Sequence, residues 1–489
     1  MKTFLCIDAG TTKIKAALLT SESDFICIAS KNVSVSMSSP GVCEIDMEEY
    51  WKDLCEVITT LRCNSPHWNE ICGVGVCAQG DGAWLLDENG EPVRPAILWN
   101  DTRPGTIQKE ELSQINEKCI ALNTTPLFSG AFPIILNWLK KNERERYKRV
   151  KWVLHCKDWI NYKLTRNIAT DVTDASTAVF DIFDKKYRYE ILDWLDISEI
   201  KDCLPDVFLS SETVGNITKE VSRDLKIPEG VPVIAGTLDV IAAATGNYLM
   251  MPGQKGSIIG TTLANFVVLN EEEARKNMSS LGSVLCHTES GMYIRQMSAL
   301  SGASNLDWIR KIMVEDMTYA DLESKLSDIP IGSNGVLFLP YLYGERAPFR
   351  LPNASAVFLG LRAHHTKYDM IRAVYEGITL ALHDCYQNLP RYKNVLYVAG
   401  GGAQSDLLCQ AICDCEAEPV VRNQTKELGI LGVCYLLQKA FGQEPKVNDQ
   451  NLTHFYPNAK NHEKYLHLYE CYMKYKNVMI EQWEQLNSI

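Results

Sequence analysis

The sequence has no long hydrophobic run. No stretch approaches the 18 uninterrupted apolar residues that mark a membrane-spanning helix. The apolar residues 4–7, ahead of Asp8, are too few for the hydrophobic region of a secretory signal. We therefore expect a cytoplasmic protein that neither crosses a membrane nor is secreted.

The chain also lacks an excess of basic residues. Its 49 Lys and Arg residues are outnumbered by 61 Asp and Glu residues, which gives a formal net charge of −12 at pH 7. A nucleic-acid or anionic-membrane surface needs clustered positive charge, so we expect no partner of either kind. A local phosphate site built from backbone amides and a metal ion is still compatible with this charge.

Cysteine is plentiful, but it shows no zinc-ligand spacing. The 17 cysteines are scattered through apolar patterns, and Cys413-Asp414-Cys415 lacks the separation of a chelating pair. In such patterns cysteine behaves as a small hydrophobic residue. This usage is typical of a reducing compartment and predicts no structural zinc.

A length of 489 residues is too great for one hydrophobic core, so we expect two domains. Strand and helix patterns alternate, which indicates an α/β fold. Outside two hairpins, the expected strands are 25–35, 71–77, 231–235 and 395–399, and the expected helices are 47–62, 240–244, 371–389 and 405–413. Residues 106–195 have a mostly helical pattern.

The domain boundary is expected at residues 246–253, where Gly, Pro and Met interrupt the periodicity. This divides the chain into an N-terminal domain, 1–246, and a C-terminal domain, 247–455. Within the remaining residues, 456–489, the stretch 460–485 is predicted to form a helix that packs back on the body.

The tripeptide Gly-Thr-Thr occurs twice, at Gly10-Thr11-Thr12 and at Gly260-Thr261-Thr262. Each copy follows a short apolar strand and precedes a strand of alternating pattern, so each is predicted to be a β-hairpin tip. Glycine at a tip permits positive φ, and converging backbone N–H groups with two hydroxyls form an anion-binding site. One copy alone would more simply be an ordinary turn. Two matched copies predict that both halves grip one polyphosphate.

Five short motifs follow one another along the chain. They are Asp8-Ala9-Gly10-Thr11-Thr12, the segment 97–103, Gly236-Thr237-Leu238-Asp239, the segment 338–346 and Gly400-Gly401-Gly402-Ala403. Together they resemble the FGGY carbohydrate kinases, and residues 356–376 resemble that family's C-terminal signature. The resemblance covers essentially the whole chain.

This resemblance implies the actin-like ATPase fold, with two ribonuclease H-like domains around a deep cleft. It also implies an ATP-dependent kinase that uses Mg²⁺ and transfers the γ-phosphate to a hydroxyl of a small sugar. Phosphoryl transfer to a hydroxyl needs cradled phosphates, a divalent metal ion and a group that accepts the proton.

Two carboxylates are assigned to this chemistry. Asp8, on the strand ahead of the first tip, is expected to hold Mg²⁺ through water, although it could instead cap the turn. Asp239 ends a strand and opens a helix, and the family places its catalytic Asp here. We expect Asp239 to be the general base, and a helix N-cap role would be compatible with that.

Sugar contacts are expected from two segments. Gln79-Gly80-Asp81 resembles the Ser-Gly-Gln-Met-His-Gly segment of xylulokinases, with Gly80 in place of Met and Asp81 in place of His. Glycerol kinases carry Arg-Glu after the Gln, and that pair is absent here. The second segment carries Trp99, whose indole can stack on a sugar face, and the charged residues Asp101 and Arg103. An internal Asp101–Arg103 ion pair that braces the loop is the alternative.

ATP contacts are expected from both halves. The phosphates should meet the two tips, formed by Gly10, Thr11, Thr12, Gly260, Thr261 and Thr262. Lys15 is expected either on phosphate or on a solvated strand face. At the adenosine end, Gly401, Gly402 and Ala403 lead from a strand into a helix, where missing side chains let the nucleotide approach the backbone. Asn305 lies in the segment 302–308, which resembles a second adenine-side wall in L-xylulose kinases.

The Gln79 segment favours a pentulose such as D- or L-xylulose. Erythritol, ribulose and gluconate-like acceptors stay open, as do the hydroxyl that is phosphorylated and a homodimeric state. Two other protein classes are also weighed. An actin-like or chaperone-like ATPase would lack the segment 79–103, and a sugar-sensing regulator would usually carry a basic DNA-binding extension.

Overall fold

The computed structural model describes residues 2–425, 427–445 and 452–486. The first lobe is built on a mixed sheet with the strand order β13-β14-β5-β1-β2-β3, and β15 also pairs with β5. These strands are β1 (Thr3–Ala9), β2 (Lys13–Thr20), β3 (Phe25–Asn32), β5 (Ile71–Ala78), β13 (Thr213–Asn216), β14 (Pro232–Ile234) and β15 (Thr237–Leu238). β1 is antiparallel to β2 and parallel to β5, and β5 is parallel to β14 and β15.

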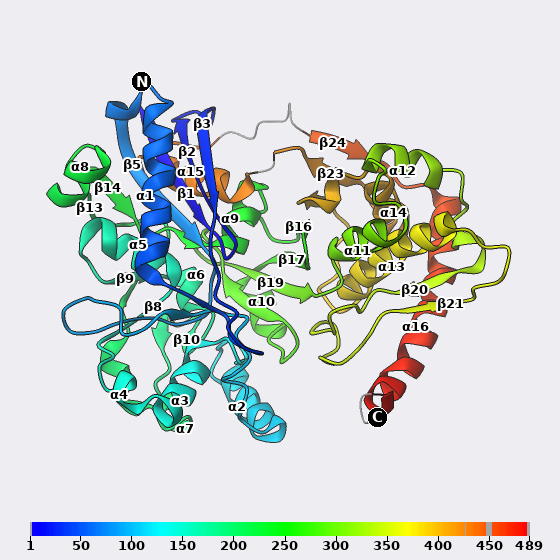
Figure 1. The fold of residues 1–489 in the computed structure, drawn as a ribbon, viewed down its shortest axis with the longest axis horizontal. Coiled ribbons are helices and arrows are strands. Elements are labelled where there is room, and N and C mark those ends of the chain that lie inside the picture. Colours follow the sequence, from blue (N-terminus) through cyan, green and yellow to red (C-terminus); the bar gives the residue numbers. More distant parts are fainter. Residues whose placement is uncertain (1, 426, 446–451, 487–489) are drawn as a thin grey trace.

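The second lobe contains a sheet of the order β18-β19-β17-β16-β22-β23-β24. Its strands are β16 (Lys255–Ile259), β17 (Leu263–Asn270), β18 (Ser283–Cys286), β19 (Met292–Ala299), β22 (Leu396–Ala399), β23 (Val420–Asn423) and β24 (Leu452–Phe455). β16 is antiparallel to β17 and parallel to β22, which is parallel to β23. The path β19-β17-β16-β22-β23 therefore repeats β3-β2-β1-β5-β14 in order and direction. The predicted two-domain α/β architecture is confirmed, and the two lobes lie side by side (Figure 1).

The helices of the first lobe are α1 (Met47–Cys63), α2 (Lys109–Ala121), α3 (Phe132–Asn142), α4 (Arg144–Tyr147), α5 (Cys156–Thr165), α6 (Val172–Ala175), α7 (Glu190–Trp194), α8 (Lys219–Leu225) and α9 (Asp239–Gly246). Alternate residues of β1 serve two cores. Leu5 and Ile7 lie in a core with residues of α1 and α5, and Phe4 and Cys6 face the opposite side. Burial on both faces explains why β1 is apolar from Phe4 to Ile7.

The prediction of a mostly helical 106–195 region was incomplete. Four short strands interrupt its helices, namely β8 (Trp152–Leu154), β9 (Ala169–Asp171), β10 (Phe180–Asp181) and β11 (Lys186–Tyr187). β8 pairs with β6 (Trp84–Leu86) and β9 pairs with β12 (Asp206–Phe208). β10 and β11 pair with each other. Strands of two or three residues carry no readable period, and only their pairing partners define them. The other short strands are β4 (Glu44–Ile45), β7 (Ala96–Ile97), β20 (Leu337–Leu339) and β21 (Val357–Leu359).

The second lobe is organised around the long buried helix α13 (Lys367–Gln387), which contacts α11, α14 and the sheet. Its other helices are α10 (Glu271–Lys276), α11 (Ser304–Met313), α12 (Tyr319–Leu326), α14 (Asp406–Glu416), α15 (Leu428–Ala440) and α16 (Ala459–Leu486). The C-terminal helix α16 buries Tyr465, Tyr472 and Trp483 against a cluster that includes Tyr341. Among the described residues, no helix combines the length and apolar character needed to span a bilayer.

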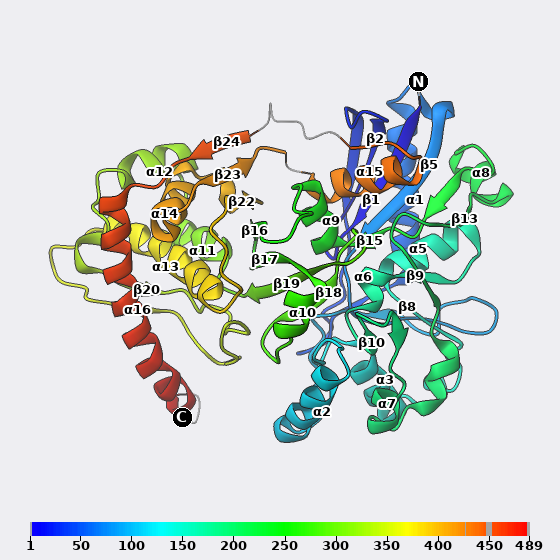
Figure 2. The ribbon, with the colours of Figure 1, turned by 180° about the vertical axis from the view of Figure 1, so that it is seen from behind.

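Helix α15 follows the second sheet in sequence but packs on the first lobe. It crosses α9 and covers the face of β1 and β5 that carries Phe4 and Cys6. Figures 1 and 2 show it in orange beside the blue strands of the first lobe. The sequence did not predict this position, because an apolar helix does not reveal which of two sheets it covers.

Replacing Gly432 with Val should open the α9–α15 crossing. A Cβ at Gly432 would lie 2.0 Å from the carbonyl oxygen of Ala242, and one at Gly246 would lie 2.1 Å from that of Leu428. Because backbone cannot yield as a flexible side chain does, the helices must separate. We expect the free energy of unfolding to fall by about 2–3 kcal/mol in urea titrations. Lys439→Val, at the other end of α15, is the control, and an equal loss in both variants would contradict close packing as the cause.

Candidate active site

The site begins where three parallel strands end together. Asp8 of β1 pairs with Cys77 of β5, and Ala78 of β5 pairs with Leu238 of β15. Gln79 and Asp239 directly follow their strands, so they lie at the same sheet edge as Asp8. Asp239 is the first residue of α9 and Leu238 is its N-cap, so the proposed N-cap role for Asp239 was wrong.

Burial gives Asp239 the protonation behaviour of a base near neutral pH. It raises the pKa of the Asp239 carboxyl to about 7, and the charge of Asp8 contributes to the rise. Burial also raises the pKa of Asp8 to about 6, although Lys15 opposes the shift. Oδ1 of Asp239 accepts a hydrogen bond of 2.6 Å from the backbone N–H of Val240. The negative charges of Asp8 and Asp239 repel each other. A cation bound beside these two carboxylates would therefore be stabilised.

The surroundings of Asp8 include the beginning of α15. A Cβ at Gly429 would lie 3.2 Å from Oδ2 of Asp8, so glycine keeps space beside the carboxylate. The Lys15 ammonium group lies 2.6 Å from Oε2 of Glu427 in a partly buried ion pair. Lys15 is therefore not on a purely solvated strand face. Its contact with phosphate stays a prediction.

At the first hairpin tip, the Thr11 hydroxyl joins two of the predicted sugar segments. It donates to Oε1 of Gln79 at 2.8 Å and accepts from the indole N–H of Trp99 at 3.1 Å. Thr11 is thereby fixed between Gln79 and Trp99, although these residues are far apart in the sequence. The structure brings the first phosphate tip and the sugar segments into one site.

Several buried polar atoms here lack a hydrogen-bond partner within the described chain. They are Nε2 of Gln79, Oδ1 of Asp81, Oδ1 of Asp174 and Nε2 of His155. Gly80 contributes space, since a Cβ there would lie 2.0 Å from Cδ1 of Leu238 and 3.5 Å from Oδ1 of Asp174. Unpaired buried polar atoms are costly, so their gathering indicates a site for a polar ligand. A polyhydroxylated molecule fits, because each hydroxyl can donate and accept.

Asp81 is the departure from the xylulokinase pattern, and its environment is unusual. Its backbone adopts positive φ, 53°. Burial raises the pKa of its carboxyl to about 7, and His155 and Arg346 oppose the rise. In the xylulokinase segment a histidine stands at the position of Asp81. Here the imidazole near the Asp81 carboxylate is that of His155, the residue just before α5.

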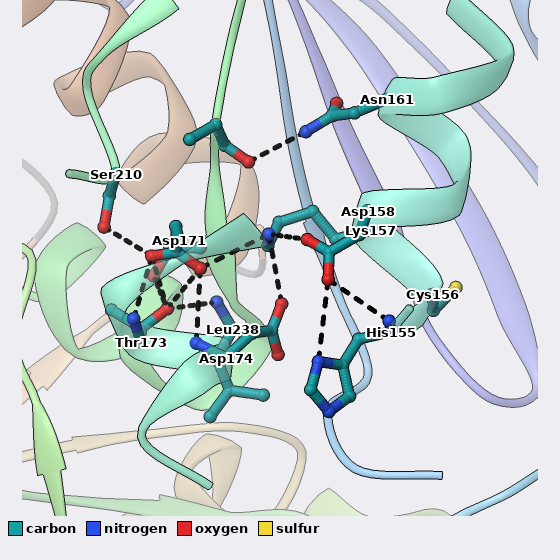
Figure 3. A network of polar contacts seen from close by, with 12 residues as sticks. His155, Cys156, Lys157, Asp158, Asn161, Asp171, Thr173, Asp174, Ser210 and Leu238 are labelled. Carbon is teal, nitrogen blue, oxygen red and sulfur yellow. Dashed lines mark hydrogen bonds and ion pairs between the residues drawn. The ribbon is translucent and has the colours of Figure 1, made fainter. Parts of the chain in front are cut away.

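A buried ion network supports this part of the site (Figure 3). Lys157, which is 0% exposed, lies with its ammonium 2.5 Å from Asp158, 3.3 Å from Asp171 and 3.2 Å from Asp174. Asp171 caps α6 by accepting from the N–H groups of Thr173 and Asp174. The cap fixes the short helix, and α6 places the Asp174 carboxylate beside Gly80.

His155, Asp158 and Asp174 could in principle hold a metal ion. The Lys157 ammonium already lies within ion-pair distance of two of these carboxylates, so the positive charge is supplied by the protein. The donor chemistry at Asp8 fits Mg²⁺ better, because carboxylate oxygens are hard ligands and the ammonium that acts on Asp8, that of Lys15, is paired with Glu427.

Asp101 and Arg103 form the bracing ion pair that the sequence left as an alternative. Asp101 is 0% exposed and accepts from the Cys43 backbone N–H at 2.8 Å. The Arg103 guanidinium pairs with Asp101 at 2.7 Å and also with Glu44. With their charges engaged in the protein, these two residues position the Trp99 loop, and direct sugar contact by them is disfavoured.

The second tip and the adenosine-side residues form one cluster at the end of β16. The Ala303 N–H donates to the Gly260 carbonyl at 2.7 Å, and the Ser304 hydroxyl donates to the Thr261 carbonyl at 2.9 Å. Gly402 lies against Ile259 and Ala303, while no atom lies within 4 Å of a Cβ built at Gly401. Ala403 and Asn305 are buried, and Nδ2 of Asn305 bonds to the Gly302 carbonyl at 3.1 Å. The predicted nucleotide residues of this lobe are thus neighbours.

The tip glycines do not adopt the positive φ that glycine permits. Neither Gly10 nor Gly260 is among the residues with positive φ, whereas Gly400 has a φ of 95°. A Cβ at Gly260 would meet only the Thr262 carbonyl oxygen, at 3.8 Å. Backbone conformation therefore does not require glycine at either tip, and the close approach of a phosphate there stays a prediction.

Four residues of the site were missed by the sequence analysis, namely His155, Lys157, Asp174 and Arg346. The first three lie in residues 155–174, from the start of α5 to α6, where no sequence motif distinguishes them from ordinary helix residues. Arg346 ends the segment 338–346 that carried the family resemblance, so a signal existed, but nothing in it indicated contact with the other lobe.

The duplicated sheet, with carboxylates at one strand edge, is the arrangement of the actin-like ATPase fold. Residues 3–246 match the N-terminal domain of the FGGY family of carbohydrate kinases, and residues 255–440 match its C-terminal domain. A probable L-xylulose kinase of Haemophilus influenzae is 28% identical, over 97% of this chain and 98% of that protein. A xylulose kinase of Lactococcus lactis is 30% identical, over 97% of this chain and 96% of that protein.

Among solved structures, a ligand-bound xylulose kinase from Lactobacillus acidophilus superposes with a TM-score of 0.90 at 24% identity, covering 99% of this chain and 100% of the other. The protein belongs to the FGGY family of carbohydrate kinases. It is a carbohydrate kinase, and the predictions of family and enzyme class are confirmed.

Proposed function

We propose that this kinase phosphorylates a pentulose, with D- or L-xylulose as the preferred acceptor. The observation that carries the proposal is the group of unpaired buried polar atoms on Gln79, Asp81, His155 and Asp174 beside Asp239. These atoms suit a chain of hydroxyls, and Trp99 offers an apolar face. The xylulose and L-xylulose kinases among the relatives support the same acceptor class.

In the proposed reaction the acceptor hydroxyl lies beside Asp239. Asp239 takes the hydroxyl proton as the oxygen attacks the γ-phosphorus of ATP, and ADP leaves. The tips at Thr11 and Thr261 hold the phosphates through backbone N–H groups, and the Gly401–Gly402 region receives the adenosine. Mg²⁺, held by Asp8 through water, would neutralise charge on the phosphates.

Sugar acids are the less suitable acceptors. Asp81, Asp174 and Asp239 carry carboxylates whose pKa values burial raises to about 7, 6 and 7, so a further negative charge is disfavoured. Like charges in a buried site repel strongly. A neutral ketose is free of this cost.

A coupled ADP-release assay over D-xylulose, L-xylulose, ribulose, erythritol, glycerol and gluconate tests the proposal. We expect one xylulose enantiomer to give the highest kcat/KM, about tenfold or more above glycerol and gluconate, because a buried polar group left unpaired costs at least about 1.4 kcal/mol. ADP release without acceptor is the control. If gluconate or glycerol gave the highest kcat/KM, the assignment to a pentulose would be wrong.

A further inference from the structure

Arg346 belongs to the second lobe but reaches the sugar segment of the first. Its guanidinium carbon lies 5.8 Å from the centre of the Trp99 ring, a cation–π distance. Nε donates to the Ser298 carbonyl at 2.7 Å. Within the part of the chain that the structure describes, Nε is the only guanidinium nitrogen of Arg346 with a hydrogen-bond acceptor. The remaining donors are available to a ligand.

The charge of Arg346 is balanced from both lobes. Burial lowers the pKa of its guanidinium, and the carboxylates of Glu345 and Asp81 oppose that change. Asp81 lies in the first lobe and Glu345 adjoins Arg346. The cation is therefore stabilised fully only when Asp81 and Trp99 occupy their present positions.

Glu345 anchors Arg346 to the strand end that precedes the adenosine-side segment. It is 1% exposed. Its carboxylate accepts from the Leu300 N–H at 2.7 Å and from the Ser301 hydroxyl at 2.6 Å. The backbone that carries Arg346 cannot shift without moving residues 300–301 or breaking these charge-assisted bonds.

The residues that follow Ser301 hold the second phosphate tip. Ala303 and Ser304 donate to the carbonyl groups of Gly260 and Thr261, as described above. Gly302 lies so close that a Cβ would come within 2.5 Å of the Thr261 carbonyl oxygen. Continuous contacts thus lead from Trp99, through Arg346 and Glu345, to the tip at Gly260.

We propose that Arg346 is a positioning residue that couples acceptor binding in the first lobe to nucleotide binding at the second hairpin. An acceptor that fixes Asp81 and Trp99 stabilises Arg346 in the position seen here. Because Glu345 adjoins Arg346 and is hydrogen-bonded to Leu300 and Ser301, residues 300–304 are then stabilised in their present position as well. The inference rests on the proposed function. By linkage, the nucleotide must then strengthen acceptor binding by the same factor.

Calorimetric titration of a non-hydrolysable ATP analogue, without and with the best acceptor of the assay panel at saturation, tests the coupling. In the wild type we expect the acceptor to tighten analogue binding by about 5-fold or more. Arg346→Met should reduce this factor to about 1–2, while analogue affinity without acceptor stays within about threefold of the wild type. Arg346→Lys, which keeps the charge but loses the planar group, should retain part of the factor. Arg350→Met, at an exposed arginine nearby, is the matched control.

The outcomes separate the two proposals. Unchanged coupling in folded Arg346→Met protein overturns the role of Arg346 and leaves the kinase function intact. Equal loss of analogue affinity with and without acceptor also overturns it, because that result indicates damage to the nucleotide site alone. A wild type that phosphorylates no sugar of the panel instead refutes the proposed function.

Discussion

Asp239→Asn should lower kcat on the best acceptor by a factor of about 100 or more, the usual effect of removing a general base. The amide keeps the size of the side chain but cannot accept the hydroxyl proton. Because Asp239 is the first residue of α9 and lies outside both hairpin tips, the analogue affinity should change little. Steady-state kinetics and nucleotide titration measure the two effects. A variant with near-normal kcat would remove Asp239 from the mechanism.

The pH profile gives a second measure of the same role. Since burial raises the pKa of Asp239 to about 7, the base is protonated below neutral pH, and kcat/KM should fall about tenfold per pH unit there. Above that pKa the profile should level off. Asp239→Asn should remove the acidic limb, whereas Asp202→Asn, on the surface, should keep it. An acidic limb that persists in Asp239→Asn would belong to another group.

Lys157→Met should destabilise the protein by about 3–5 kcal/mol at pH 8, the range observed when one partner of a buried ion pair is removed. The substitution keeps an unbranched side chain of similar length. It leaves the carboxylates of Asp158, Asp171 and Asp174 without the ammonium that lies within 3.3 Å of each in the wild type. Urea unfolding at constant m-value measures the loss.

The loss should be smaller at pH 5 than at pH 8. In the wild type, burial favours the neutral form of Asp158, but Lys157 outweighs it and the pKa lies at about 2. A lowered pKa contributes stability above the unfolded pKa, and that contribution is lost as pH falls toward 2. Without Lys157, burial should raise the pKa values of the Asp158 and Asp174 carboxyls, so their protonation at pH 5 should reduce the cost of burying them. Lys163→Met, on the same helix with its ion pair to Glu48 at the surface, should cost about 1 kcal/mol or less. A pH-independent loss would show that packing, not charge, is responsible.

The placement of Asp8 and Asp239 shows what a motif predicts well. Asp8 lies near the end of a short apolar strand and Asp239 directly follows one. Parallel strands deliver their ends to one sheet edge, so local pattern and repeat were sufficient. Asp101 and Arg103 show the opposite case. The same two residues could contact sugar or brace a loop, and only the contacts with Cys43 and Glu44, far away in the sequence, favour bracing.

The sequence by itself determined the two-lobed α/β fold, the duplicated hairpins and the family, because these depend on local periodicity and on motifs in a fixed order. Only the tertiary structure placed α15 on the first lobe, joined Lys157 to three carboxylates and brought Arg346 to Trp99. The physical reason is that apolar faces and buried charges can be satisfied by many partners. Their actual partners are set by which segments the packed lobes bring within a few ångströms, and neither composition nor spacing along the chain encodes that choice locally.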